Sequence, residues 1–213
     1  MKPLISWRKF RYSDIDEINH LYYKVTGFIR DRNQYSWQWL ESPAGNASIY
    51  LIEWKDSKDS NTLLIGHHGI MPITFSNKGK YFIAGKTENT MVEKKFRGSI
   101  LYPRFERKFK QDYLERYSIL FSTQGPSEAI RQRLAQGYKE IGVWRNIRIS
   151  SLKSILFFLK YKIKFRNLKL NFKEFNNDCL SKYDFDDLWN SASIYYPTTP
   201  SRRAKDLKWR FVD

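Results

Sequence analysis

The chain has 213 residues, of which 41% are hydrophobic and 17% aromatic. A chain of this length and composition can bury a sizeable core, so we expect a folded protein and exclude an intrinsically disordered one. A single cysteine, Cys179, excludes an intrachain disulfide and a cysteine-rich zinc site. No apolar run approaches the roughly 20 residues of a membrane-spanning helix, and residues 1–10 lack the apolar core of a signal peptide. We therefore expect a cytoplasmic location.

The formal net charge of +16 is concentrated in two segments. Residues 94–110 carry seven basic side chains and one acidic one, and residues 141–173 carry nine basic side chains and none that is acidic. Such patches indicate anionic partners, with solvated surface faces as the alternative. An anionic membrane surface suits the second patch, for which a packed linker helix is the other interpretation. Nucleic acid is less favoured, because no RNA-binding or helix-turn-helix motif accompanies the basic residues.

The first part of the chain predicts an edge strand and two helices. The strand covers residues 5–13, where apolar and polar side chains alternate. A helix follows over residues 14–26, with Ser13 or Asp14 as its N-cap. Its apolar side chains share one face: Ile15, Ile18, Leu21 and Tyr22. A second helix covers residues 33–42 and ends at the turn that follows it.

Three strand-like segments come next and predict an antiparallel meander. They are separated by polar turns and cover residues 47–54, 62–75 and 80–93. The remaining elements of this part are a helix at 101–117, a strand at 118–123, a helix at 127–136 that Gly137 stops, and closing strands over 138–150. The order of these elements predicts a mixed α/β layer fold.

A faint internal repeat appears when the sequence is shifted by 170 residues. Six residues then meet identical or similar ones: Asp14, Asp16, Glu17, Ile18, Arg32 and Trp39 meet Asp184, Asp186, Asp187, Leu188, Arg202 and Trp209. We therefore predict a first domain at residues 1–150, a basic linker helix or strand at 151–175, and the start of a second, incomplete copy at 176–213. Chance similarity is the alternative.

The segment "VEKKFRGSILY" joins the last strand of the meander to the next helix. A strand that runs into a basic, glycine-containing turn and then a helix offers unpaired backbone N–H groups at the start of that helix. The helix dipole also favours negative charge there. The segment therefore suits an anion such as a phosphate, although a basic surface loop has the same composition.

Two short motifs carry a resemblance to a known family. "ENTMVEKKFRGSIL" contains Phe96, Arg97 and Gly98 where the GNAT acetyltransferase superfamily has its "yRGkG" turn, and "LAQGYKEIG" matches that superfamily's "lGF" step. Over residues 5–150 the chain resembles this superfamily. It looks closest to the tandem-repeat acyltransferases of bacterial surface-polysaccharide biosynthesis, on the evidence of "DLKWRF" near the C-terminus. The resemblance implies a mixed, mainly antiparallel sheet flanked by helices.

The resemblance also implies an activity and a cofactor site. The activity is N-acyl transfer that moves the acetyl group of acetyl-CoA to a primary amine on a small molecule, such as an amino sugar or nucleotide sugar. The fourth strand and the turn after it hold the cosubstrate in the family, which here corresponds to Met91, Val92, Lys95, Arg97, Gly98, Ser99 and Ile100. The sequence leaves a homo-oligomer open.

Three positions depart from the family pattern. Ile100 and Tyr102 stand where the anion-binding turn has glycines, and Arg133 stands where many relatives have a tyrosine that protonates the leaving thiolate. Side chains at the first two positions would crowd a pyrophosphate, because a glycine serves there by lacking a Cβ atom. These departures support an alternative, a degenerate module of the same fold that binds a partner without catalysis.

Glu88 and His68 are the candidate catalytic residues. Acyl transfer requires an uncharged amine, so a general base near the thioester is useful. Glu88 precedes the proposed cofactor turn, and its structural alternative is an ion pair with Lys86. His67 and His68 would point to opposite faces of a strand, so only one of them can face a pocket. Neither has a recognisable metal partner, and we expect no metal site.

The first helical region is rich in aromatic side chains, which are Tyr22, Tyr35, Trp37 and Trp39. Their helical spacing favours packing in a core. Stacking against a sugar or a nucleotide is the other interpretation.

Overall fold

The computed structural model describes residues 4–56, 61–97, 101–123, 125, 127–142 and 175–213. The predicted linker, apart from its last residue, and the predicted cofactor residues Gly98, Ser99 and Ile100 lie outside these ranges. Of the closing strands predicted over 138–150, residues 138–142 form no strand, and the others also lie outside the described residues.

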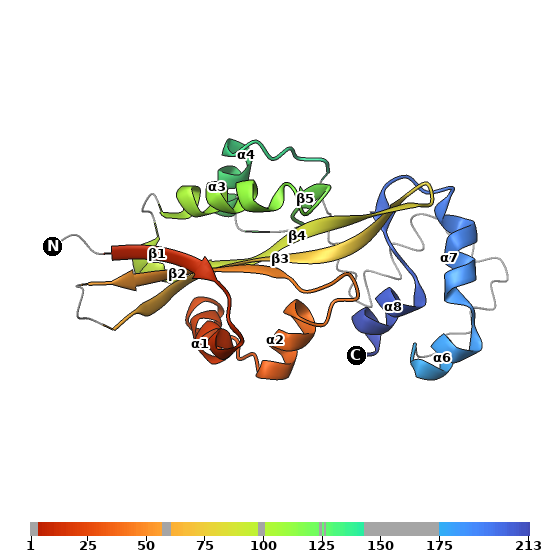
Figure 1. Ribbon diagram of the computed structural model, residues 1–213, viewed down its shortest axis with the longest axis horizontal. Helices are drawn as coiled ribbons and strands as arrows, with labels where there is room; N and C mark the ends of the chain where they lie inside the picture. The colour runs from red at the N-terminus through yellow and green to blue at the C-terminus, as the bar shows by residue number, and fades with distance from the viewer. Residues whose placement is uncertain (1–3, 57–60, 98–100, 124, 126, 143–174) are drawn as a thin grey trace, which may run out of the picture.

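The described fold is centred on one sheet (Figure 1). Its strands lie side by side in the order β1 (Leu4–Lys9), β2 (Ser48–Lys55), β3 (Leu63–Asn77), β4 (Lys80–Val92) and β5 (Ile119–Phe121). The first four are antiparallel to their neighbours, whereas β5 runs parallel to β4. The predicted meander and the predicted mainly antiparallel fold class are both confirmed.

Helices cover both faces of this sheet (Figure 1). After the short 3-10 helix η1 (Tyr12–Asp14), the helices α1 (Ile15–Thr26) and α2 (Arg32–Trp39) pack on one face. The opposite face carries α3 (Leu101–Tyr113) and α4 (Ser127–Ala135), which follow the 3-10 helix η2 (Lys94–Phe96). The C-terminal part contains α6 (Asn177–Lys182), α7 (Phe185–Ser193), the short strand β6 (Thr199–Pro200) and α8 (Ala204–Phe211).

The hairpin of β3 and β4 extends beyond the rest of the sheet. Its turn consists of Lys78 and Gly79, whose φ angles of 49° and 80° are those that a two-residue hairpin turn requires. Strand β2 pairs with β3 only as far as Ile70. The outer edge of β3 beyond this point is therefore open to other partners, and β6 pairs with it at Phe75 and Ser76.

Each face of the sheet has its own apolar cluster. Side chains of α1 and α2, including Ile18, Tyr35 and Trp39, are fully buried on one face. On the other face, Phe105 and Tyr113 of α3 pack with Tyr117. The prediction that this helix runs to residue 117 was wrong: α3 ends at Tyr113, and the next residue, Leu114, is 56% exposed.

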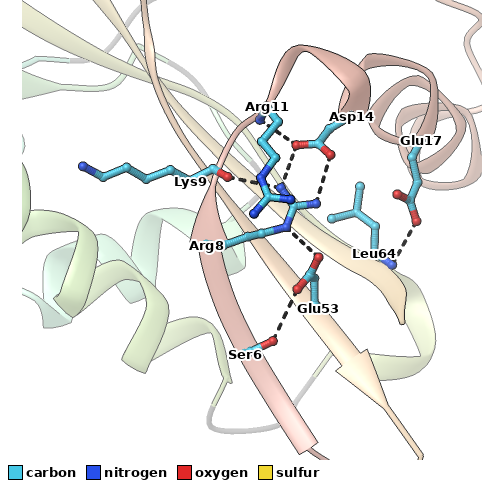
Figure 2. A network of polar contacts seen from close by, with 8 residues as sticks. All are labelled: Ser6, Arg8, Lys9, Arg11, Asp14, Glu17, Glu53 and Leu64. Carbon is cyan, nitrogen blue, oxygen red and sulfur yellow. Dashed lines mark hydrogen bonds and ion pairs between the residues drawn. The ribbon is translucent and has the colours of Figure 1, made fainter. Parts of the chain in front are cut away.

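An ion-pair network holds α1 to the sheet (Figure 2). The guanidinium of Arg8 on β1 donates to both oxygens of Asp14, at 2.7 and 2.9 Å, and to Oε1 of Glu53 at 2.6 Å. Asp14 occupies the predicted N-cap position of α1 but makes no side-chain capping bond, because its carboxylate accepts from Arg8 and from the backbone N–H of Arg11. Burial alone would raise the pKa of Asp14, yet these hydrogen bonds lower it below its usual value.

The two histidines of β3 face opposite sides of the sheet, as predicted. His67 is fully buried against Trp39, with ring centroids 5.4 Å apart, and its Nδ1 donates to the backbone oxygen of Asn89 at 3.0 Å. His68 is equally buried, but packs on Phe105 of α3 at 5.5 Å. Burial lowers the pKa of His67 to about 3, so this ring is neutral at physiological pH.

Helix α2 approaches the sheet very closely at one glycine. A Cβ atom added to Gly69 would lie 2.2 Å from Cζ3 of Trp39, whose ring is fully buried. Only a residue without a side chain therefore fits below this indole ring.

We expect Gly69→Ala to lower the free energy of unfolding by roughly 1–3 kcal/mol, because the methyl group must displace the indole ring of Trp39. Urea denaturation followed by circular dichroism measures this change. Gly142→Ala is the matched control, since nothing lies within 4 Å of the methyl group it adds. Equal stabilities of the two variants would contradict the tight contact.

The burial of His67 predicts a stability that falls in mild acid. Its pKa is about 3 in the folded chain and near 6.5 in the unfolded chain, so between these values only the unfolded chain binds the proton. The free energy of unfolding should decrease by about 1.4 kcal/mol for each pH unit below about 6.5. Urea titrations at pH 7 and pH 5 measure this slope. His67→Gln should reduce it, whereas His20→Gln, at an exposed position, should not.

Candidate functional site

The edge of β4 that faces β5 is only partly paired. Strand β5 pairs with β4 from Ala84 to Lys86, and Thr87 Oγ1 donates to the backbone oxygen of Phe121 at 3.3 Å. Beyond this contact, residues 88–92 have no β5 partner among the described residues. An unpaired strand edge presents backbone N–H and C=O groups that can bind an extended ligand.

A β-bulge interrupts β4 at the start of this edge. His67 pairs with Met91 and Gly69 with Glu88, so β4 has one residue more than β3 between these pairs. Asn89 lies in the bulge with a φ of 45°, a value that few residues other than glycine adopt. Its backbone oxygen is fixed by His67, as described above, and its side-chain nitrogen lies 3.4 Å from Oε1 of Gln38. Bulges of this kind often lie next to active sites, where they redirect a strand.

Glu88 lies immediately before the bulge and faces the α1/α2 side of the sheet. Its Oε1 accepts a hydrogen bond from Nζ of Lys86 at 2.6 Å, which is the pairing expected from the sequence. Both side chains line a pocket of about 510 Å³. This volume lies within the range of about 300–1,000 Å³ that is typical of small-molecule sites.

The structure does not bring His68 and Glu88 together. Glu88 pairs with Gly69, whose missing side chain would meet Trp39 on the α1/α2 face, whereas His68 is buried on the α3 face. Of the two candidate catalytic residues, only Glu88 lines the pocket.

The described cofactor candidates lie at the end of β4 and in η2. Met91 and Val92 bury their side chains in the two apolar clusters, so only their backbone remains for a ligand. Arg97 donates from Nε to the backbone oxygen of Val92 at 2.9 Å. Lys95 has a side chain that is 58% exposed and lies 3.6 Å from Glu93, so its ammonium can reach an anion in solvent. These positions fit a phosphate-bearing ligand beside the end of β4.

Arg133 takes up a buried position at the carboxyl end of β5. It is 8% exposed, and its Nη1 donates to Oγ of Ser122 at 2.9 Å. Its Nε is buried with no hydrogen-bond partner among the described residues. The position that the resemblance assigns to a tyrosine is thus occupied by a cation that cannot serve as a neutral proton donor.

The C-terminal part of the pocket lining is not predicted by the sequence. Its lining includes Trp37 from α2, and also Arg202, Trp209 and Arg210 from the C-terminal segment. The repeat singles out Arg202 and Trp209 as counterparts of earlier residues, but no sequence signal indicates that they lie beside Trp37 and Glu88. The helical spacing predicts that Tyr35, Trp37 and Trp39 pack in the core. Tyr35 and Trp39 do so, but Trp37 is only half-buried.

Two further findings concern only the part of the chain that the structure describes. No helix there is long and apolar enough to cross a membrane. No group of three or more histidine, cysteine, aspartate and glutamate side chains there is arranged to hold a metal ion.

Comparisons with known proteins find relatives by structure and not by sequence. No protein-family model matches the chain, and no curated protein sequence matches it. An acetyltransferase from Trypanosoma brucei is similar with a TM-score of 0.50 at 13% identity, over 69% of this chain and 99% of that one. A transcriptional regulator from Bacillus halodurans C-125 is similar with a TM-score of 0.51 at 11% identity, over 68% of this chain and 99% of that one. The mixed sheet and its flanking helices are therefore those of the GNAT acetyltransferase fold.

Proposed function

We infer that this protein is an N-acetyltransferase that moves an acetyl group from acetyl-CoA to a primary amine on a small molecule. The observation that carries this proposal is the position of Glu88. It lines a pocket of about 510 Å³ and lies directly before the bulge that begins the unpaired edge of β4. A carboxylate, a pocket and a free strand edge therefore meet at one point of an acetyltransferase fold.

The free edge of β4 and the residues after it fit the cosubstrate. Acetyl-CoA supplies an acetyl group activated as a thioester, together with an extended pantetheine arm and phosphates. The backbone of residues 88–92 can pair with that arm as a further strand would. Lys95 and Arg97 lie at the end of β4, where they can bind phosphate oxygens. Gly98, Ser99 and Ile100 complete the proposed turn.

Glu88 would prepare the acceptor for attack. A primary amine is mostly protonated at neutral pH and has no lone pair in that state. The Glu88 carboxylate can accept a proton from the ammonium, directly or through water, and the free amine can then attack the acetyl carbonyl carbon. The new C–N bond forms in a tetrahedral intermediate, and the C–S bond breaks when this intermediate collapses. The leaving thiolate takes up the proton that the attacking nitrogen loses, and the proton accepted by Glu88 passes to solvent. Lys86 holds the carboxylate in place through the 2.6 Å hydrogen bond.

The acceptor that we propose is an amino sugar or a nucleotide sugar, used in the biosynthesis of a bacterial polysaccharide. The half-buried Trp37 and the neighbouring Trp209 supply aromatic surface in the pocket, which suits the face of a sugar ring. A cytoplasmic location accompanies this proposal. Assembly into a homo-oligomer is a further proposal. So is contact with an anionic membrane surface through the basic residues 141–173, which lie mainly outside the described residues.

A binding module without catalysis is the second candidate. It is favoured by Arg97, whose side chain donates to the backbone of Val92 and so already occupies part of the β4 edge. It is also favoured by the buried Arg133 at the position of the expected tyrosine.

Glu88→Gln should lower the rate of acetyl transfer about 100-fold, because the amide cannot accept the proton of the ammonium. Its affinity for acetyl-CoA should stay the same. The release of free thiol from acetyl-CoA in the presence of a panel of amino sugars measures the rate, and calorimetric titration measures the affinity. The control is Glu115→Gln, an exposed carboxylate on the opposite side of the fold. A wild-type chain that neither binds acetyl-CoA nor releases thiol would support the binding module instead.

A further inference from the structure

The C-terminal segment is attached to the long hairpin of β3 and β4. Strand β6 pairs with the free outer edge of β3, and the backbone N–H of Ser201 donates to the oxygen of Thr74 at 2.8 Å. The guanidinium of Arg203 lies 3.9 Å from the centre of the Tyr81 ring on β4. Residues 199–203 are therefore fixed to the sheet by backbone pairing and by a cation–π contact.

Helix α8 is held against α2 by two tryptophans. Trp37 and Trp209 stack with ring centroids 5.4 Å apart, and each indole N–H donates to the backbone oxygen of the other residue, at 2.7 and 3.0 Å. Figure 1 shows α8 and α2 on the same side of the sheet. This reciprocal contact satisfies both indole groups and sets the position of α8 beside the pocket.

The pocket accordingly has two walls that lie far apart in the sequence. One wall is made by the first domain and includes Lys86 and Glu88 from β4. The other wall is made by β6 and α8, which contribute Arg202 and Arg210. A molecule that fills the pocket must contact both walls.

The two walls differ in whether their basic side chains form ion pairs. On the first wall, Lys86 and Glu88 form an ion pair with each other. On the second wall, Asp206 accepts a hydrogen bond from Oγ of Ser201 at 2.6 Å. Neither Arg202 nor Arg210 forms an ion pair with any residue in the described ranges. The second wall therefore offers two guanidinium groups to a ligand, and guanidinium is the side-chain group best suited to phosphate and carboxylate oxygens.

We propose that the acceptor carries an anionic group, a phosphate or a carboxylate, at the end opposite its amine, and that Arg202 and Arg210 bind this group. The amine lies toward Glu88, and the middle of the molecule lies against Trp37 and Trp209. Only the placement of the amine beside Glu88 rests on the proposed function. The binding of the anionic group by the two arginines does not depend on it. The C-terminal segment thus selects the substrate, although Glu88 belongs to the first domain.

The test compares three amines that differ in their anionic group, measured without acetyl-CoA. They are D-glucosamine, D-glucosamine 6-phosphate and 2-amino-2-deoxy-D-glucuronate, and the last two carry their anionic group at C6, away from the amine at C2. Quenching of tryptophan fluorescence reports binding, because Trp37 and Trp209 line the pocket. We expect one or both of the anionic amines to bind at least about tenfold more tightly than glucosamine, as charged hydrogen bonds to guanidinium groups predict. The 6-phosphate and the glucuronate separate phosphate from carboxylate recognition.

Arg202→Gln and Arg210→Gln, alone and combined, should remove this preference without changing the affinity for glucosamine. The matched control is Arg131→Gln on α4, which removes an exposed arginine outside the pocket. Equal affinities for the three amines, no binding of either anionic amine at millimolar concentration, or a preference that survives in the double variant would each overturn the proposal. Acetyl-CoA binding is measured separately by calorimetry, so its failure would count against the proposed function and not against the anion site.

Discussion

The contact between the indole ring of Trp39 and the backbone of Gly69 determines where the candidate site lies. Gly69 allows α2 to come this close, since a methyl group there would overlap the ring. Gly69 is also the strand partner of Glu88. The same contact that buries α2 therefore brings the two residues before Trp39 beside the candidate base. Trp37 then reaches the pocket, and Gln38 reaches the bulge.

The sheet and its main helices could be predicted from the sequence because their signals are local. Alternating apolar residues and the turn at Lys78 and Gly79 indicate the β3–β4 hairpin, and the spacing of Ile15, Ile18 and Leu21 indicates α1. Glu88 could be placed on the strand that precedes the proposed cofactor turn for the same reason. Asp14 shows the limit of this reasoning: a local pattern suggests a cap, but the carboxylate binds Arg8, whose position depends on the pairing of β1 with β2.

The second wall of the pocket could not be predicted, because it results from contacts over long sequence separations. Trp37 and Trp209 are 172 residues apart, and nothing in the residues around either one indicates the other. The bulge at Asn89 is a similar case. It depends on the pairing of β4 with β3 and on the hydrogen bond from His67, neither of which leaves a pattern within β4 alone.

The predicted repeat stays a prediction, although its two copies can be compared in the structure. Asp184 caps α7, which begins where the shift of the sequence would place α1. In the first copy Asp16 pairs with Arg32 at the start of α2, and in the second Asp186 accepts from the backbone N–H of Ala204 at the start of α8. The environments differ, however: Ile18 is fully buried against the sheet, whereas its counterpart Leu188 is 64% exposed.

The reciprocal bonds between Trp37 and Trp209 have a consequence for the order of assembly. Closing the loop between Trp37 and Trp209 costs conformational entropy. The contacts between the two residues offset this cost only after the segments that carry them have folded. The sheet with α1 and α2 depends on contacts that are closer in sequence, and can form while the C-terminal residues are still being synthesised. The pocket is then completed last, when α8 docks on a surface that is already folded. Ligand binding should consequently report on the final step of folding.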